Sequence, residues 1–265
     1  MPLDERTLAA LDGEGYTSLE ALHAVAAGSP TLSEAVPFIC INGKTYWVKA
    51  NSQYGLASEL IAGRLAARAS AGPATRIIHV SPQAALSAPH LAGLVVGSED
   101  VPNAINARDL RATGTTVKPG QLDRVSLARV HVFQTWIGVQ DEQCLVRLSD
   151  GLVVSLDYGA AFSDTSMLSD PNVVLVDIAG LEMPERKNTA VIYRAVTEIE
   201  GVSDGELIEA VSRMPAGESQ REGSRGRPPQ PELWSAARAR RLDIARWLAY
   251  RRERLREVME TWLRA

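Results

Sequence analysis

The feature that most constrains the fold is a helix, a break and a hairpin in succession within residues 131–164. The first residues are apolar at helical spacing, and Gly138 breaks that helix. Two short β-runs follow, at residues 144–148 and 152–156, and Ser149-Asp150-Gly151 supplies the turn between them. Glycine tolerates the positive φ that tight hairpin turns require. The sequence therefore predicts a helix that delivers the chain directly into a hairpin.

Two carboxylates are expected to meet at the open end of this hairpin. Asp141 precedes it and Asp157 follows it, so both leave from the end opposite Asp150. Gly159 lies just beyond and is expected to let the backbone turn sharply. Phosphoryl transfer depends on positioning and charge neutralisation. It uses one carboxylate that can take a proton and a second carboxylate that can hold a metal ion, and these two aspartates fit that arrangement. The alternative is that both are turn formers and caps of an ordinary surface hairpin.

Length and composition indicate a soluble globular protein. The chain has 265 residues, 45% hydrophobic and 23% charged, enough for one large domain or two lobes. No run approaches the ~18 apolar residues of a membrane span, and residues 1–15 lack the pattern of a signal peptide. We therefore expect a cytoplasmic protein without a membrane partner. Cys40 and Cys144 lie in apolar runs and are expected to be buried free thiols. The four histidines are not spaced like zinc ligands, so we do not expect a structural zinc site.

The net charge of −4 conceals an asymmetry between the two parts of the chain. Residues 215–265 carry 12 Arg against 7 Asp and Glu, whereas residues 1–214 have a balance of −9. A basic tail can bind nucleic acid or an acidic partner. Acidic residues and Trp interleave with these arginines, however, which favours a solvated helix face over a nucleic-acid site.

Periodicity and turn signals predict the other elements. Helices are expected at residues 17–27, 56–70, 122–137, 186–200, 204–213 and 232–263. Strands are expected at residues 36–41, 45–50, 77–80 and 91–96, the first two joined by the hairpin signal Asn42-Gly43. Residues 97–100 are expected to cross between two lobes, 1–97 and 98–265. Residues 215–231 are expected to form a flexible loop.

A charged pair is expected between the second predicted strand and the helix that follows. Lys49 shares a strand face with Trp47, because side chains alternate in a strand. Glu59 lies within the apolar part of the helix, where a buried carboxylate must be paired to be tolerated. Lys49 is the nearest candidate partner, and the alternative is that both side chains reach solvent separately.

These parts resemble the HipA-like kinase family, bacterial proteins whose fold is similar to that of protein and phosphoinositide kinases. The resemblance runs from about Thr17 to the C-terminus and rests on TYWVKAN, ASELIAGRLAARASAGPAT, LVVGS, FQTWIGVQDEQCLV, LVVSLDYGAAF and the helix from Trp234 to Leu263. It implies an α+β, two-lobed protein-kinase-like fold with a small β-rich N-lobe and a mainly helical C-lobe.

The resemblance also implies a role for each candidate residue. Lys49 would contact the phosphates of ATP, and Glu59 would hold Lys49. Asp141 would be the catalytic aspartate, and Asp157 would bind magnesium. The crossover residues Val96, Gly97 and Ser98 would face the adenine.

The catalytic loop departs from the family pattern at three positions. Val139 stands in place of the first Asn, Glu142 in place of Arg, and Cys144 where the second metal-binding Asn belongs. A thiol is a poor magnesium ligand beside an amide or carboxylate oxygen. The sequence thus predicts an ATP- and magnesium-dependent kinase that phosphorylates a Ser or Thr hydroxyl of an unidentified protein. The alternative is a pseudokinase that serves as a nucleotide-binding or protein-interaction module.

Overall fold

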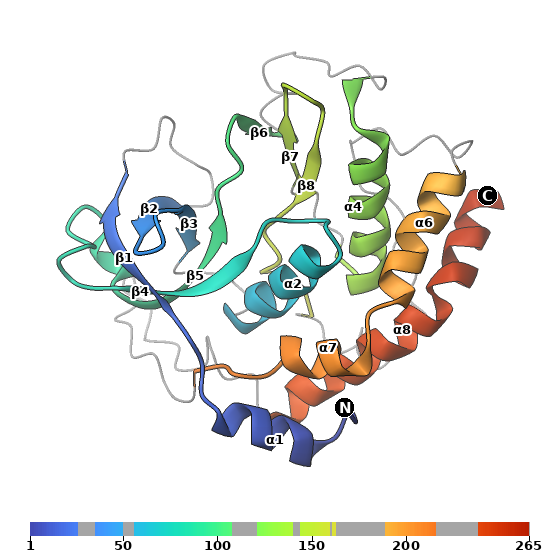
Figure 1. The fold of residues 1–265 in the computed structure, drawn as a ribbon, viewed down its shortest axis with the longest axis horizontal. Coiled ribbons are helices and arrows are strands. Elements are labelled where there is room, and N and C mark those ends of the chain that lie inside the picture. The colour runs from blue at the N-terminus through green and yellow to red at the C-terminus, as the bar shows by residue number, and fades with distance from the viewer. Residues whose placement is uncertain are drawn as a thin grey trace, which may run out of the picture.

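A closed β-barrel and a group of α-helices lie on opposite sides of the molecule, with a helix, α2, between them (Figure 1). The computed structural model describes residues 1–25, 35–49, 56–107, 121–139, 144–159, 161–162, 189–215 and 238–264. Helices and antiparallel strands both contribute, in agreement with the predicted α+β class.

The barrel has five strands in the order β1-β2-β3-β5-β4. Their bounds are Leu19–Ala24, Val36–Cys40, Thr45–Lys49, Gly93–Glu99 and Thr75–Val80 in that order. β1 pairs in parallel with β4, and the other neighbours are antiparallel. The inward-facing side chains pack into an apolar cluster that includes Phe38, Cys40, Tyr46, Val48, Ile78 and Val95.

The prediction of a helix at residues 17–27 was wrong, because Leu19–Ala24 form β1. This strand is hydrogen-bonded to β2 on one side and β4 on the other, which closes the barrel and leaves neither neighbour with an open edge. A real helix was missed upstream. α1 (Glu5–Gly13) is capped by the Asp4 carboxylate, which accepts the Thr7 N–H at 2.7 Å.

The Asn42-Gly43 hairpin forms as predicted between β2 and β3. Gly43 has φ +76°, a conformation that a side chain would disfavour. Tyr46 and Val48 point into the barrel, whereas Trp47 and Lys49 alternate to the other face and are half-buried.

The prediction that the chain crosses between two lobes from residue 97 onward was also wrong. β5 continues to Glu99 and is paired with β3 and β4 on its two sides. Gly97 is inside the barrel, where an added Cβ would lie 2.9 Å from Ile78 and 3.1 Å from Tyr46. The chain leaves the barrel after this strand, and the expected boundary between residues 97 and 98 falls within β5.

A second, three-stranded sheet follows, in the order β6-β7-β8. β6 (Ala104–Asn106) was not predicted, whereas β7 (Cys144–Arg147) and β8 (Val153–Ser155) form the predicted hairpin. The helix before it, α4 (Arg124–Ile137), ends at Gly138, which is left-handed with φ +68°.

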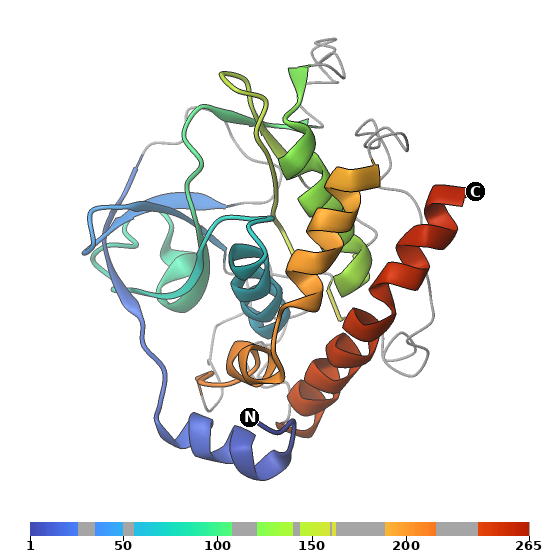
Figure 2. The same ribbon diagram turned by 45° about the vertical axis from the view of Figure 1, so that its right-hand side comes forward.

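The remaining helices pack against α4 or against one another (Figure 2). They are α2 (Leu56–Arg68), α6 (Thr189–Glu200), α7 (Asp204–Ala210) and α8 (Arg238–Arg264), and a short 3₁₀ turn, η1, spans Pro89–Leu91. α8 buries an apolar stripe formed by Leu242, Ala245, Leu248, Leu255, Met259 and Trp262. Ala67 of α2 is exposed, although its spacing from Leu60 and Gly63 is typical of a core position.

One large apolar core joins α2, α4, α6, α7 and α8. Leu8 and Leu11 of α1 belong to it, so the first residues of the chain pack with its last helix. Many arginines of α8 contact other elements: Arg241 and Arg251 are buried and donate to backbone carbonyls. In the part of the chain described, no helix combines the length and apolar character that crossing a membrane requires.

Candidate active site

The site is centred on an ion pair between residues far apart in the sequence. Lys49 Nζ, at the end of β3, lies 2.7 Å from Asp157 Oδ1, two residues after β8. The side chains are only 13% and 19% exposed. Two of the residues singled out from the sequence are therefore in direct contact, and partial burial strengthens their attraction relative to a surface pair.

Asp157 has an unusual backbone. Its φ is +62°, in the left-handed region that non-glycine residues rarely adopt, although Asp is among the more tolerant. We predicted that Gly159 would provide the sharp turn, but the left-handed residue is Asp157 itself. Contacts around the turn must hold this conformation, since it is not the preferred one for a residue with a side chain.

Glu59, in the first turn of α2, lies beside this ion pair and is 2% exposed. Among the described residues, its buried Oε2 atom has no hydrogen-bond partner. Burial raises the pKa of the Glu59 carboxyl, Lys49 opposes the shift, and Asp157 adds to it. Among the described residues, Lys49 pairs with Asp157 and not, as expected, with Glu59.

Tyr158 anchors the other side of the turn. Its hydroxyl donates to the Ser155 carbonyl at 2.8 Å, and its ring packs edge-on against Phe133 with centroids 5.8 Å apart. Gly72 makes room for this contact, because an added Cβ would lie 2.5 Å from the tyrosine oxygen. None of these residues was predicted from the sequence to belong to the site. Only the position of Tyr158, directly after Asp157, could have drawn attention to it.

Cys144 is part of the core, not an open metal position. It is fully buried in β7 opposite Ser155, and Gln134 Nε2 lies 3.7 Å from its sulfur. Cys40 and Cys144 are both buried free thiols, as predicted. Asp141, Glu142 and the neighbouring glutamines lie outside the described residues. Within the described ranges, no three His, Cys, Asp or Glu residues are grouped to hold a metal ion.

The residues predicted to face adenine lie within a strand that is paired on both sides. Val96 is opposite Lys49 in β3 and opposite Ile77 in β4. Ser98 Oγ lies 3.4 Å from Thr75 Oγ1. Pairing with β3 and β4 therefore uses backbone N–H and C=O groups of this strand that an adenine base would need for its own hydrogen bonds. The chain is held to β3 as far as the Asp100 N–H, which donates to the Thr45 carbonyl at 2.9 Å.

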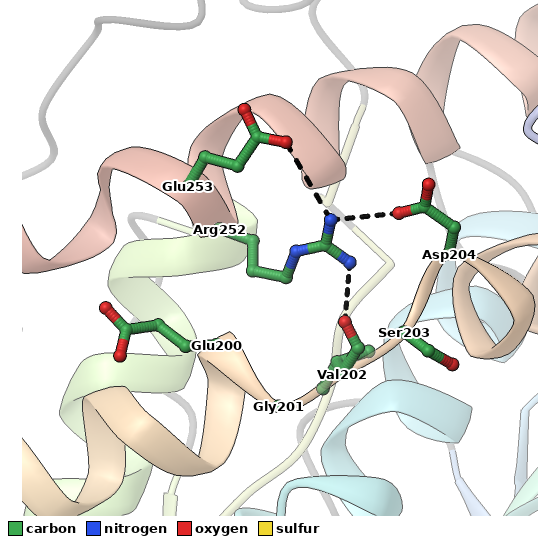
Figure 3. A pocket seen from close by; sticks show the side chains of 7 residues that line it. All are labelled: Glu200, Gly201, Val202, Ser203, Asp204, Arg252 and Glu253. Atoms are coloured by element: carbon green, nitrogen blue, oxygen red, sulfur yellow. Dashed lines mark hydrogen bonds and ion pairs between the residues drawn. The ribbon is translucent and has the colours of Figure 1, made fainter.

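A shallow pocket of about 410 Å³ lies elsewhere, where the turn between α6 and α7 meets α8 (Figure 3). Arg252 reaches across it, with its guanidinium 2.9 Å from Asp204 and 3.9 Å from Glu253, and it also donates to the Val202 carbonyl. None of the predicted site residues lines this pocket. Arg252 pairs with Asp204 and Glu253, and Glu200 pairs with Arg256 outside the pocket. These charged groups join α6, α7 and α8, which is a structural arrangement.

Comparison with known proteins gives a fold but no family. No protein-family model matches the chain, and no curated protein sequence does. Among solved structures, the Helicobacter pylori proinflammatory kinase CtkA matches with a TM-score of 0.52 and 12% identity, over 93% of this chain and 98% of that one. The chain has a kinase-like fold. The identity is too low for the match to establish activity or substrate.

Two structures of the Golgi casein kinase, one of them with Mn/ADP bound, match with lower TM-scores of 0.46 and 0.45. Their identities are 12% and 13%, and each match covers 97% of this chain and 77% of the other. With TM-scores below 0.5, these two matches carry no argument about the site.

Proposed function

We propose that this chain is an ATP- and magnesium-dependent kinase of the HipA-like family that phosphorylates a Ser or Thr hydroxyl of a protein. The observation that carries the proposal is the 2.7 Å contact between Lys49 and Asp157 in a kinase-like fold. A lysine at the end of a barrel strand and an aspartate after a hairpin are parts that phosphoryl transfer uses. The barrel and α2 would form one lobe, and the helices with the second sheet the other.

Each residue of the ion pair would take a new partner when the nucleotide binds. Lys49 would turn from Asp157 to the phosphate oxygens, and Asp157 would hold the magnesium ion. The ion supplies charge neutralisation on the phosphates. Asp141, outside the described residues, would orient the acceptor hydroxyl and take its proton. The hydroxyl oxygen would then bond to the γ-phosphorus as the bond to the β–γ bridging oxygen breaks, leaving ADP.

The donor set fits a magnesium ion bound largely through the nucleotide. Magnesium in such sites uses one or two carboxylates, with substrate phosphates and water completing the octahedron. Asp157 offers one carboxylate, and Cys144 offers none, because its thiol is enclosed in the core. Residues 140–143 would have to supply any second protein ligand.

The adenine would meet the segment after β5, and not Val96, Gly97 and Ser98. The ladders of β3 and β4 use the strand backbone at those positions. We therefore place the base against the chain from Val101 onward, where the chain passes from the barrel to β6.

A pseudokinase is the second candidate, and Cys144 favours it. Burial of a thiol where the family pattern has a metal-binding amide weakens metal coordination more than it weakens nucleotide contacts. Such a protein would bind nucleotide or a partner without transferring phosphate.

The first prediction concerns nucleotide binding by Asp157→Asn. We expect the wild type to bind ATP more tightly with magnesium than without it, and the variant to lose about tenfold or more of that enhancement, because it lacks the charged ligand. Isothermal titration calorimetry with and without magnesium measures this. Asp150→Asn, at the other end of the same hairpin, is the matched control and should bind like the wild type.

Phosphate transfer then separates the two candidates. Radiolabel transfer from γ-labelled ATP to a generic protein substrate, lost in Asp141→Asn, supports the kinase. Magnesium-dependent binding without transfer supports the pseudokinase. No ATP binding under any condition contradicts both nucleotide proposals.

A further inference from the structure

We infer that Gln134 is a positioning residue for the proposed metal site. Through a hydrogen bond to Ser155 it ties the open end of the β7–β8 hairpin, and with it Asp157, to the end of α4. The inference rests on the proposed function, because it concerns how the proposed metal ligand is held. In this role Gln134 touches neither nucleotide nor metal, and it acts through Ser155, two residues before Asp157 in the chain.

Gln134 is a buried residue in the last turn of α4 that contacts both strands of the hairpin. It is 2% exposed, and its Nε2 donates to Ser155 Oγ of β8 at 2.7 Å. The same nitrogen lies 3.7 Å from Cys144 Sγ of β7. Cys144 and Ser155 are directly opposite each other in the ladder, at the end away from the turn. One amide group therefore reaches both strands at the end from which Asp157 leaves.

The main chain of Gln134 holds the start of the segment that leads to Asp141. Its carbonyl accepts the N–H of Gly138, the left-handed residue that ends α4, and the N–H of Val139 at 3.2 Å. Val139 is two residues before Asp141 in the sequence. Gln134 thus contacts the chain towards the proposed catalytic aspartate through its carbonyl. Through its side-chain amide it contacts the strand that leads to the proposed metal ligand.

Ser155 passes this constraint to Asp157, because all of its polar groups are hydrogen-bonded and it is fully buried. Its N–H donates to the Ala71 carbonyl at 2.8 Å, its carbonyl accepts the Tyr158 hydroxyl at 2.8 Å, and its hydroxyl accepts from Gln134. Asp157 is left-handed, with φ +62°, and a non-glycine residue keeps this conformation only where its surroundings determine it. Of these three bonds, the one from Gln134 connects the turn to the helix before the catalytic loop.

The other end of the hairpin is held on α4 by separate contacts. The Val153 N–H donates to Ser126 Oγ at 3.0 Å, and the Asp123 N–H donates to the Gly151 carbonyl at 2.8 Å. The hairpin therefore lies beside α4 and is bonded to it at both ends (Figure 1). Loss of the bond from Gln134 would release the open end and leave the turn end in place.

Alkylation of the two cysteines in the nucleotide-free protein tests this anchor. Cys144 lies beside Gln134 and Cys40 lies in the barrel, and each buried thiol reacts only when its own surroundings open. Gln134→Met keeps the length of the side chain but removes its hydrogen bonds. We expect iodoacetamide to modify Cys144 about tenfold faster in this variant than in the wild type, and Cys40 less than about threefold faster. An equal rise at both thiols, or no rise at Cys144, would overturn the inference.

A double-mutant cycle tests whether Gln134 and Ser155 act on the metal site as one unit. The measured quantity is the factor by which magnesium raises the affinity for ATP, obtained by isothermal titration calorimetry. We expect Gln134→Met and Ser155→Ala each to reduce this factor about tenfold, and the double variant also about tenfold instead of about a hundredfold. Losses that multiply, or single variants without any loss, contradict the inference.

Ser126→Ala is the matched control, because it removes a hydroxyl that bonds the same strand from the same helix, at the end away from Asp157. It should leave the magnesium factor within about threefold of the wild type. A loss as large as that in Gln134→Met would mean that any loosening of the hairpin is sufficient, and would overturn the specific role of Gln134. Should the wild type bind no ATP, the proposed function fails, but the alkylation experiment still decides whether Gln134 anchors the hairpin.

Discussion

At the scale of single residues, the buried ionisable side chains differ in how completely their polar atoms are hydrogen-bonded. Within the part of the chain that the structure describes, Glu59 and His131 each have a buried polar atom without a hydrogen-bond partner. Arg241, by contrast, is paired with Asp12 and also donates to the Val211 carbonyl. Burial without a full set of partners disfavours the charged form of a side chain. We therefore expect the protonation of Glu59 and His131 to link the stability of the protein to pH.

We expect the protein to lose stability in mild acid because His131 is buried. Burial lowers its pKa from 6.5 to about 4, so the unfolded chain binds a proton at pH values where the folded protein does not. The free energy of unfolding should therefore fall as the pH decreases from 6.5 towards 4, by about 2 kcal/mol between pH 7.5 and pH 5. Urea unfolding at these two pH values measures the change.

His131→Phe is the matched variant, because it keeps a ring against Trp262, whose centroid is 4.8 Å from that of the histidine. The variant should lose this part of the pH dependence, since it has no group to protonate. An unchanged difference between the two pH values would show that other groups are responsible.

At the scale of elements, close approach decides how α2 sits on the barrel. Gly63 meets Thr75 of β4, and Gly72 meets Tyr158 and the Ser155 carbonyl, so the helix and the turn after it both depend on the absence of a side chain. The barrel and the candidate site are connected through these two contacts.

Gly63→Ala should destabilise the protein, although alanine is the better helix former. A Cβ at this position would lie 2.1 Å from Thr75 Oγ1 and 2.5 Å from its Cβ, so the helix or the strand must shift. We expect a loss of about 2 kcal/mol in the free energy of unfolding, against a helix-propensity gain of about 1 kcal/mol. Denaturant unfolding provides the measurement.

Gly13→Ala is the control, because no described residue has an atom within 4 Å of a Cβ added at this last residue of α1. It should be neutral or slightly stabilising. Equal effects of the two substitutions would mean that α2 is not held by close packing.

At the scale of the whole molecule, a buried ionic contact ties the two ends of the chain together. Asp12, at the end of α1, accepts from Arg241 of α8 at 2.7 and 3.0 Å and from the Arg213 N–H at 3.1 Å. The side chains of Asp12 and Arg241 are 12% and 9% exposed. This contact explains why the first helix packs with the last and not with the barrel that follows it in the sequence.

Asp12→Ala should cost about 3 kcal/mol in the free energy of unfolding, because it removes the partly buried carboxylate that pairs with the Arg241 guanidinium. Amide exchange in α1 should increase as well, since the helix loses its anchor. Asp150→Ala removes an exposed ion pair with Arg147 and should have little effect. A similar small effect of both substitutions would contradict a role for Asp12 in joining the chain ends.

Much of the local structure was predictable because its causes are local. Asn42-Gly43 and Ser149-Asp150-Gly151 specify hairpins through turn geometry, and the apolar spacing of α8 specifies its buried stripe. Ser203 and Glu206, three residues apart at the start of α7, form a capping box, which is a local pattern. Lys49 and Asp157 were both singled out from the sequence, whereas Asp141 lies outside the described residues.

The sequence by itself thus determined hairpins, helix faces and the residue types available for a site. The tertiary structure alone decided that Leu19–Ala24 is a strand, because its ladder partners, β2 and β4, are distant in the sequence. It also decided that Lys49 contacts Asp157 instead of Glu59, and that Asp157 itself takes the left-handed conformation. The physical reason is that pairing, burial and backbone strain depend on which surfaces meet, and no short stretch of sequence contains both surfaces.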